Sequence, residues 1–182
     1  MSETMAEMGW TICEGPVGPL TVVAGEAGIR GVWFEGQAPA LETDARRELP
    51  AAATQLAEYF AGERRAFELE LDLRGEPLQL AVWEQLRGIP YGETTSYGEL
   101  TKRVDPELFP AELEPYKRVR LAAATIGRTP TPIIVPCHRV IGADGSLTGY
   151  GGGLERKRTL LELERRVAGP PPGDEADQLA LI

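Results

Sequence analysis

The 182-residue chain lacks the residues from which several kinds of site are built. It contains one histidine and two cysteines, Cys13 and Cys137, which are too few ligands for a zinc site of ordinary spacing, so we expect no bound metal. The first residues, MSETMAEMGW, contain no basic segment followed by an apolar one, and we expect no secretory signal. Without such a signal, two cysteines do not predict a disulfide framework. We therefore expect a reduced, cytoplasmic protein in which a thiol can act as a nucleophile.

Long apolar runs and nucleotide-binding motifs are absent as well. No apolar segment approaches the ~18 residues of a membrane span, and we expect no membrane contact. There is no GxGxxG pattern, and the glycine-rich segment 149–153 (GYGGG) lacks the Lys-Ser/Thr pair of a phosphate loop. We therefore expect no cofactor of the nucleotide kind. The 42% of hydrophobic and 26% of charged residues are typical of a globular protein.

The net charge of −9 is unevenly distributed along the chain. Residues 1–76 hold 14 acidic and 6 basic residues, whereas residues 77–167 hold 11 acidic and 13 basic ones. Between Lys117 and Arg139 there are five basic residues and no acidic one. Such a local basic patch is what phosphate contacts require, although a run of exposed arginines is also typical of an ordinary solvated surface.

The first part of the chain predicts β structure followed by helices. Three short segments between turns read as strands: Trp10–Cys13, Leu20–Ala24 and Ile29–Phe34. Helices are expected over 41–48 and 51–61, and a further strand over Phe67–Leu73. The composition changes near 74–77, which predicts an N-terminal α/β domain over 1–76, a second domain over 77–167, and a tail over 168–182 that we expect to be disordered.

The second part predicts mainly helices. One begins at Pro77, a second covers Ser96–Arg103 with a capping box formed by Ser96 and Glu99, a third covers 116–127 and a last one Leu154–Val167, with a strand at Ile133–Val135 between them. The second and third helices resemble a helix-turn-helix whose second helix is basic. Their connection, 104–116, carries four acids and three prolines, and we expect it to fold back as a short helical piece.

Cys137 is the strongest candidate for a reactive residue. A cysteine attacks as its thiolate, and an adjacent base or cation promotes that form. In the segment 133–142 (IIVPCHRVIG) the only histidine, His138, follows directly, and Pro136 predicts a bend that takes Cys137 out of a regular strand. The alternative is a buried, unreactive Cys-His pair.

Helical spacing adds a third residue to this pair. In the last helix Leu160, Leu161 and Val167 mark the buried stripe, and Glu164 lies within it. A carboxylate on a buried face needs a partner, and histidine is a suitable one. Cys137, His138 and Glu164 would then be nucleophile, base and orienting acid. Alternatively, Glu164 lies at the edge of the stripe and reaches solvent.

Over roughly residues 10–167 the chain resembles the O6-alkylguanine–DNA alkyltransferases, also called methylated-DNA–protein-cysteine methyltransferases. The resemblance is densest in Val82–Leu100 and Arg120–Glu164, where PCHRVIG is followed by GYGGG and by LLELE. It implies an α+β fold, with an N-terminal antiparallel sheet and helices (ribonuclease H-like) and a C-terminal, mainly helical domain that contains a helix-turn-helix.

The resemblance also implies an activity and roles for residues. Cys137 would accept the alkyl group from O6-alkylguanine in double-stranded DNA in a single turnover, without a cofactor or an obligate protein partner; O4-alkylthymine is left open as a second substrate. His138 would take the thiol proton through a water, and Glu164 would orient His138. Arg120 would fill the gap left by the flipped guanine. Tyr97 would press on the adjoining phosphate and help to protonate the departing base.

The resemblance implies two further groups of residues. The pocket for the flipped base would consist of Val140, Tyr150 and Gly151. The remaining DNA contacts would come from basic residues and from the end of the second helix of the pair: Lys117, Arg118, Arg128 and Thr129.

The sequence departs from the family pattern in four places. Thr129 and Ile126 stand where asparagines are common, the connection between Leu100 and Arg120 is unusually long, and the zinc ligands that some relatives carry in the N-terminal domain are missing. Thr129 and the long connection put DNA affinity and reaction rate in question. Two other functions stay open: a protein that flags alkylated guanine without removing it, and a cysteine hydrolase. Of the three functions, only alkyl transfer leaves an alkyl group on Cys137.

Overall fold

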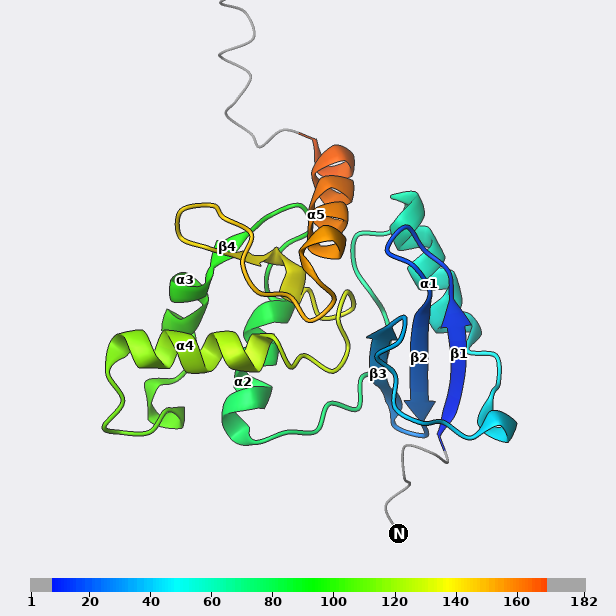
Figure 1. The fold of residues 1–182 in the computed structure, drawn as a ribbon, viewed down its shortest axis with the longest axis horizontal. Helices are drawn as coiled ribbons and strands as arrows, with labels where there is room; N and C mark the ends of the chain where they lie inside the picture. The colour runs from blue at the N-terminus through cyan, green and yellow to red at the C-terminus, as the bar shows by residue number, and fades with distance from the viewer. Residues whose placement is uncertain (1–7, 170–182) are drawn as a thin grey trace, which may run out of the picture.

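The computed structural model describes residues 8–169, which form an α+β structure of two units (Figure 1). The first unit is an antiparallel sheet with strand order β1-β2-β3 and a helix against it. Its elements are β1 (Gly9–Cys13), β2 (Leu20–Gly25), β3 (Gly28–Phe34) and α1 (Pro50–Ala61). The expected α+β class is confirmed. The tail expected to be disordered lies, from residue 170 onward, outside the described residues.

The central strand β2 provides much of the core of the first unit. Leu20 pairs with Cys13 of β1 and with Phe34 of β3, and all three side chains are buried. Helix α1 contributes Leu56 and Tyr59, both with 0% of their surface exposed. A face of α1 therefore closes the sheet, and Tyr59 ends up deep inside the protein.

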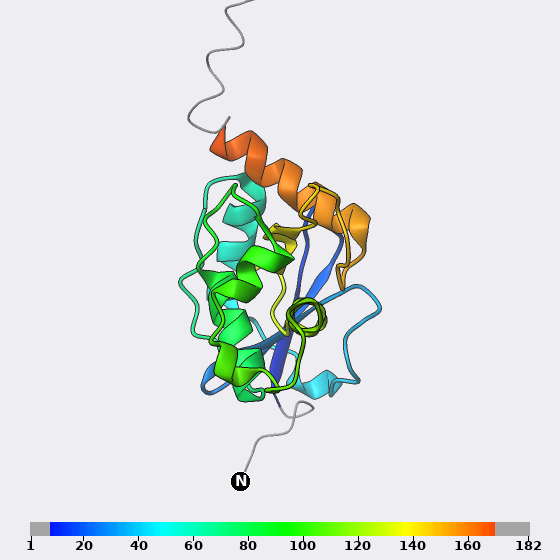
Figure 2. The ribbon, with the colours of Figure 1, turned by 90° about the vertical axis from the view of Figure 1, so that its left-hand side faces the viewer.

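The second unit is mainly helical, as expected, and contains two very short parallel strands. Its elements are α2 (Pro77–Arg87), β4 (Thr95–Ser96), α3 (Tyr97–Lys102), α4 (Pro115–Ile126), β5 (Val140–Ile141) and α5 (Leu154–Ala168). Figure 2 shows α4 almost end-on, with α2 and α3 beside it and α5 above. Ser96 caps α3 by accepting a 3.1 Å bond from the backbone of Glu99, but the Glu99 carboxylate pairs with Lys102 and leaves the expected capping box open.

The two units share buried surface. Leu160 and Leu163 of α5 pack into the core cluster of the first unit, together with Ile133 and Ile134. The expected boundary near residue 76 therefore stays a prediction. Within residues 8–169 no helix is long and apolar enough to cross a membrane, and the cytoplasmic location stays a prediction too.

Two expected elements of the first unit do not form. The helix over 41–48 is only a 3-10 turn at Thr43–Ala45, because none of these residues buries an apolar side chain that could hold a longer helix. The strand over Phe67–Leu73 is reduced to one bridge between Ile29 and Leu71. Further along β3, the amide of Val32 donates to the carbonyl of Pro130 at 2.8 Å. At this point the segment around Pro130, and not residues 67–73, pairs with β3.

The strand expected at Ile133–Val135 is a turn. Prolines at 130, 132 and 136 have no N–H to donate to a strand ladder, and Ile133 adopts a positive φ of 77°. Only an isolated bridge between Pro132 and Val135 remains. The side chains of Ile133 and Ile134 nevertheless enter the core of the first unit, so this turn joins the two units just before Cys137.

Helices α3 and α4 pack on each other as the expected helix-turn-helix pair, and their long connection is part of the core. It contains a 3-10 turn, Pro106–Leu108, as expected of a short helical piece. The side chains of Val104 and Phe109 are buried beside α2 and α4 residues. The guanidinium of Arg118 lies 5.8 Å from the ring centre of Phe109 and donates to the carbonyl of Leu113 at 3.0 Å.

Phe109→Ala should therefore lower the free energy of unfolding by about 3 kcal/mol or more, because it empties a buried site in a packed cluster. Urea denaturation measures this loss. Glu112→Ala, an exposed change in the same connection, is the control and should leave the denaturation midpoint unchanged. Equal midpoints for wild type and Phe109→Ala would mean that the connection is not anchored in the core.

Candidate active site

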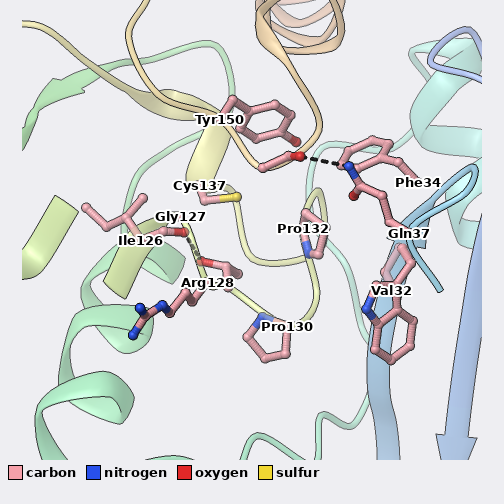
Figure 3. Close-up of a pocket in the computed structure, with 13 residues that line it drawn as sticks. Val32, Phe34, Gln37, Ile126, Gly127, Arg128, Pro130, Pro132, Cys137 and Tyr150 are labelled. Carbon is pink, nitrogen blue, oxygen red and sulfur yellow. Dashed lines mark hydrogen bonds between the residues drawn. The ribbon is translucent and has the colours of Figure 1, made fainter. Parts of the chain in front are cut away.

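Cys137 begins a 3-10 turn, Cys137–Arg139, directly after Pro136. The turn is the bend that the proline predicted, and it is followed at once by β5. The thiol is almost enclosed, with 5% of the residue exposed. Figure 3 shows its sulfur turned toward a cavity of about 340 Å³.

The enclosed thiol is a poor acid in the resting protein. Burial raises the pKa of Cys137 to about 11, and this effect outweighs the hydrogen bond with Thr129 and the charge of Lys157, which both lower the pKa. The thiol is therefore protonated at neutral pH. Nucleophilic attack needs a group nearby that takes the proton.

His138 is suited to take a proton. Its side chain is completely buried, and burial is the main reason why its pKa lies below the ordinary value, so the ring is neutral at pH 7. Nε2 lies 2.8 Å from Oε1 of Glu164 and donates its hydrogen there, which leaves Nδ1 with a lone pair. Among the residues that the structure describes, Nδ1 has no hydrogen-bond partner.

The Glu164 carboxylate collects hydrogen bonds from both units. Oε1 accepts from Tyr59 at 2.7 Å and from Arg139 Nη2 at 2.9 Å, while Oε2 accepts from Arg139 Nε at 2.9 Å and from the amide of Gly92 at 3.1 Å. Burial alone would raise the pKa of Glu164, but the bonds and charges of His138 and Arg139 outweigh it and hold the pKa well below the ordinary range. Glu164 is thus a buried anion, as its position in the apolar stripe predicted.

The sequence did not predict two of the hydrogen-bond partners of this carboxylate. Tyr59 lies 105 residues away in the chain and only its place on the buried face of α1 hinted at it. Arg139 was counted with the basic patch, but it is 6% exposed and also donates to the carbonyl of Ile89 at 2.6 Å. This arginine stabilises the interior and is not available to phosphate.

The cavity beside Cys137 has walls from both units. β3 and the turn after it provide Val32, Phe34 and Gln37; the turn after α4 provides Thr129 and Pro130. Nε2 of Gln37 donates to the carbonyl of Gly151 at 2.9 Å across this boundary (Figure 3).

The residues expected to form the base pocket lie around this cavity. Tyr150 and Gly151 line it, and the buried hydroxyl of Tyr150 has no hydrogen-bond partner within the described part of the chain. Val140 is not among the lining residues; it is packed next to Cys137 in the core cluster of the second unit. A polar group that enters the cavity could therefore bond to Tyr150.

A second hollow, of about 450 Å³, opens beside the first and contains Tyr97 and Arg120. Tyr150 and Gly151 belong to both hollows. The Tyr97 hydroxyl donates to the carbonyl of Thr148 at 2.8 Å, and burial is the main reason why its pKa is raised. Arg120 is exposed on α4, so the expected finger and the expected base pocket adjoin each other.

The other expected DNA contacts differ in availability. Lys117 and Arg128 are exposed on or just after α4, whereas Arg118 is held by the connection that precedes α4. Thr129 lines the cavity of Cys137 and bonds to the end of α4. Thr129 is partly exposed, and its contact with DNA stays a prediction.

Lys157 is a buried cation that the sequence did not predict. It has 0% exposure, and its Nζ donates to the carbonyls of Val140 at 2.6 Å and Thr148 at 2.8 Å. Burial lowers the pKa of Lys157 to about 8, so most of the amine is charged at pH 7. The ammonium therefore joins β5 to the loop between β5 and α5.

Comparison with known proteins relates this arrangement to DNA repair. Residues 77–166 match the family described as 6-O-methylguanine DNA methyltransferase, DNA binding domain, and residues 8–73 match its ribonuclease-like domain. The chain is 50% identical to the methylated-DNA–protein-cysteine methyltransferase of Mycolicibacterium paratuberculosis over 68% of this chain and 70% of that protein. It is 39% identical to the one of Methanosarcina acetivorans over 86% of this chain and 98% of that protein.

Solved structures agree with the sequence matches. The Mycobacterium tuberculosis O6-methylguanine methyltransferase is 38% identical and superposes with a TM-score of 0.74, covering 90% of this chain and 96% of that one. The same organism's OGT in complex with DNA gives a TM-score of 0.73 at 40% identity, over 87% of this chain and 93% of that one.

Glu164→Gln should destabilise the protein by about 3–5 kcal/mol at pH 7, because it leaves the buried Arg139 without its anion. The folded protein holds the pKa of Glu164 below the ordinary ~4.3, so the stability due to this group is present above that pH and is lost as the pH falls through the folded value. Urea denaturation between pH 7 and pH 3 should show the difference from wild type shrinking on acidification. Glu162→Gln, exposed on the same helix, is the control. A difference that stays constant down to pH 3 would contradict the buried anion.

Proposed function

Because the chain belongs to the 6-O-methylguanine DNA methyltransferase family, we propose that it repairs DNA by moving the alkyl group of O6-alkylguanine onto Cys137. The observation that carries this assignment is the Cys137 sulfur in the wall of a cavity, next to a buried His138–Glu164 pair. A flagging protein would need no nucleophile there. A hydrolase would leave the exposed arginine-bearing helix α4 unexplained.

The first step is activation of the thiol. The Cys137 proton passes through a water to Nδ1 of His138, the ring nitrogen that has no other partner in residues 8–169. Glu164 accepts from Nε2 and stabilises the imidazolium that results. Because the ring is neutral beforehand, it is ready to act as a base at neutral pH.

The second step is transfer of the alkyl group. A bond forms between the sulfur and the alkyl carbon, the bond from that carbon to O6 breaks, and the departing guanine regains a proton. Tyr97 helps with this proton in the proposed mechanism; the pKa of its phenol is raised, mainly by burial, so the phenol is protonated at neutral pH. The product is a thioether on Cys137, which does not release the alkyl group, so each protein molecule reacts once.

The base must leave the duplex to reach the sulfur. Helix α4 exposes Lys117 and Arg120, and Arg128 follows it, so this face offers cations to the DNA backbone. Arg120 lies in the hollow next to Tyr150 and Gly151, which are the proposed contacts of the flipped base. Arg120 fills the place of guanine in the stack while the base occupies the cavity.

Incubation with a duplex containing O6-methylguanine should add one methyl group to Cys137. Mass spectrometry of the intact protein and of its peptides measures this. Cys137→Ser should stay unmodified, and Cys13, whose pKa is raised mainly by burial, should stay unmodified in the wild type. Binding without an adduct would favour the flagging function, and an adduct on Cys13 would refute the assignment of Cys137.

Arg120→Ala should slow repair of duplex DNA at least tenfold more than it slows dealkylation of free O6-benzylguanine. The free base needs no extrusion, whereas unstacking in a duplex costs a few kcal/mol. Single-turnover rates on the two substrates measure the ratio. Lys117→Ala, an exposed cation on the same helix, should weaken duplex binding without changing that ratio. Equal losses on both substrates would place Arg120 in the chemistry or the folding instead.

A further inference from the structure

Tyr59 brings a hydroxyl from the first unit into the reactive centre. It lies on α1, its side chain has 0% of its surface exposed, and its hydroxyl donates to Oε1 of Glu164 on α5 at 2.7 Å. Figure 1 shows these two helices at the boundary between the units. The same oxygen lies 2.8 Å from Nε2 of His138. One carboxylate oxygen therefore links the first unit to the proposed base.

The hydrogen of the Tyr59 hydroxyl points to the carboxylate and not to the imidazole. The hydroxyl oxygen also lies 3.5 Å from Nε2 of His138, but that nitrogen carries the hydrogen that is donated to Glu164 and cannot accept another. Burial and the charge of Glu164 both raise the pKa of Tyr59, so the phenol stays protonated. Tyr59 is therefore a constant donor to Oε1.

Tyr59 and His138 share the negative charge of this oxygen. Oε1 also accepts from Nη2 of Arg139 at 2.9 Å, so three donors meet at one atom. A hydrogen bond to a carboxylate stabilises its charge and makes it a weaker base toward any other donor. The short bond from Tyr59 therefore weakens the bond between Glu164 and the ring.

This weakening acts on the charge state of His138. Burial lowers the pKa of the ring, and the hydrogen bond and charge of Glu164 oppose burial by favouring the imidazolium. An oxygen that is already bonded to Tyr59 offers the imidazolium less stabilisation. The 3.5 Å contact between the Tyr59 oxygen and Nε2 acts in the opposite sense, but it is longer than an ordinary hydrogen bond and is the smaller effect.

We propose that Tyr59 is a positioning residue through which the first unit controls the proposed base. Its hydroxyl occupies Oε1 of Glu164, limits the bond from that oxygen to His138, and so keeps the ring neutral until it takes the thiol proton. The proposal rests on the proposed function, in which His138 deprotonates Cys137. Tyr59 acts through the carboxylate and touches no reacting atom.

Other charged or titratable groups also face the pair of His138 and Glu164, and the test leaves them in place. They come from the 3-10 turn, from α5, from the loop after α2 and from the loop before α5: Cys137, Arg139, Lys157, Tyr91 and Tyr150. A change at position 59 removes none of these groups. A change in the pKa of the ring is then due to the Tyr59 hydroxyl.

The experiment uses the fact that His138 is the only histidine in the chain. After labelling with isotope-enriched histidine, proton–nitrogen NMR spectra contain the signals of one imidazole. They report its tautomer and its pKa without DNA. Tyr59→Phe removes the hydroxyl and keeps the ring. The matched control is Tyr91→Phe, because the ring centre of Tyr91 lies 6.0 Å from that of Tyr59 and its buried hydroxyl has no hydrogen-bond partner in the described residues.

The wild-type spectrum at pH 7 should show a hydrogen on Nε2 of His138 and none on Nδ1. Tyr59→Phe should raise the titration midpoint of the ring by about one pH unit, a tenfold change that is equivalent to about 1.4 kcal/mol. Below both midpoints the single-turnover rate of methyl transfer should then fall about tenfold, because a smaller share of the ring is neutral. The difference in rate should close at higher pH. Tyr91→Phe should keep the wild-type midpoint.

An unchanged or lowered midpoint in folded Tyr59→Phe would overturn the proposal. An equal rise in Tyr91→Phe would do the same, because it would indicate a general loosening of the interior. If Tyr59→Phe does not fold, the wild type decides. The hydroxyl hydrogen of Tyr59 should give a through-space NMR signal with the Nε2 hydrogen of His138, since both point to one oxygen, and the lack of this signal would overturn the proposal.

Failure of the proposed function looks different from failure of this proposal. In that case O6-methylguanine DNA would leave no adduct on wild-type Cys137. The titration of the His138 ring needs neither DNA nor alkyl transfer, so its midpoints in the wild type and the two variants would still decide the role of Tyr59.

Discussion

The buried Glu164 carboxylate is the interaction on which the arrangement of the two units depends. It lies on the last helix and accepts hydrogen bonds from Tyr59 of the first unit, from Arg139 beside the nucleophile and from the amide of Gly92. A carboxylate removed from water is costly unless its acceptor sites are filled, and here they are filled from three separate parts of the chain. The same anion accepts a hydrogen bond from the His138 ring, so the carboxylate that joins the units also holds the ring that we propose as the base.

The surroundings of Cys137 combine two opposing requirements. Burial strengthens the electrostatic interactions that favour transfer, but it also raises the pKa of the resting thiol and keeps it protonated. The thiol is therefore unreactive until a base takes its proton, and the charge of Lys157 then favours the thiolate. Low reactivity at rest is useful to a protein that is consumed by one alkylation, because an open thiolate would react with other electrophiles.

The face that we propose for DNA binding differs from the cavity around Cys137. The cations of α4 are exposed, whereas the acidic connection before α4 is anchored through the buried Phe109 and holds Arg118. This anchoring gives the long connection a defined place in the fold. The net acidity of the chain belongs mainly to residues 1–76, away from the helix that carries Arg120.

Local patterns of the sequence determined the α+β class, the helix pair and the residues of the reactive centre. Short β-rich segments between turns predicted the three strands, Ser96 predicted the start of α3, and the apolar stripe of α5 predicted that Glu164 is buried, since these signals act within a few residues of one another. The expected strands at 67–73 and 133–135 were wrong, because the prolines and the contact of β3 with Pro130 override local preference. The contact of Tyr59 with Glu164, the burial of Arg139 and the place of Thr129 in the wall of the Cys137 cavity were decided only by the tertiary structure. Each depends on segments that meet in space, and the free energy of burying a charged group depends on which partners meet it there.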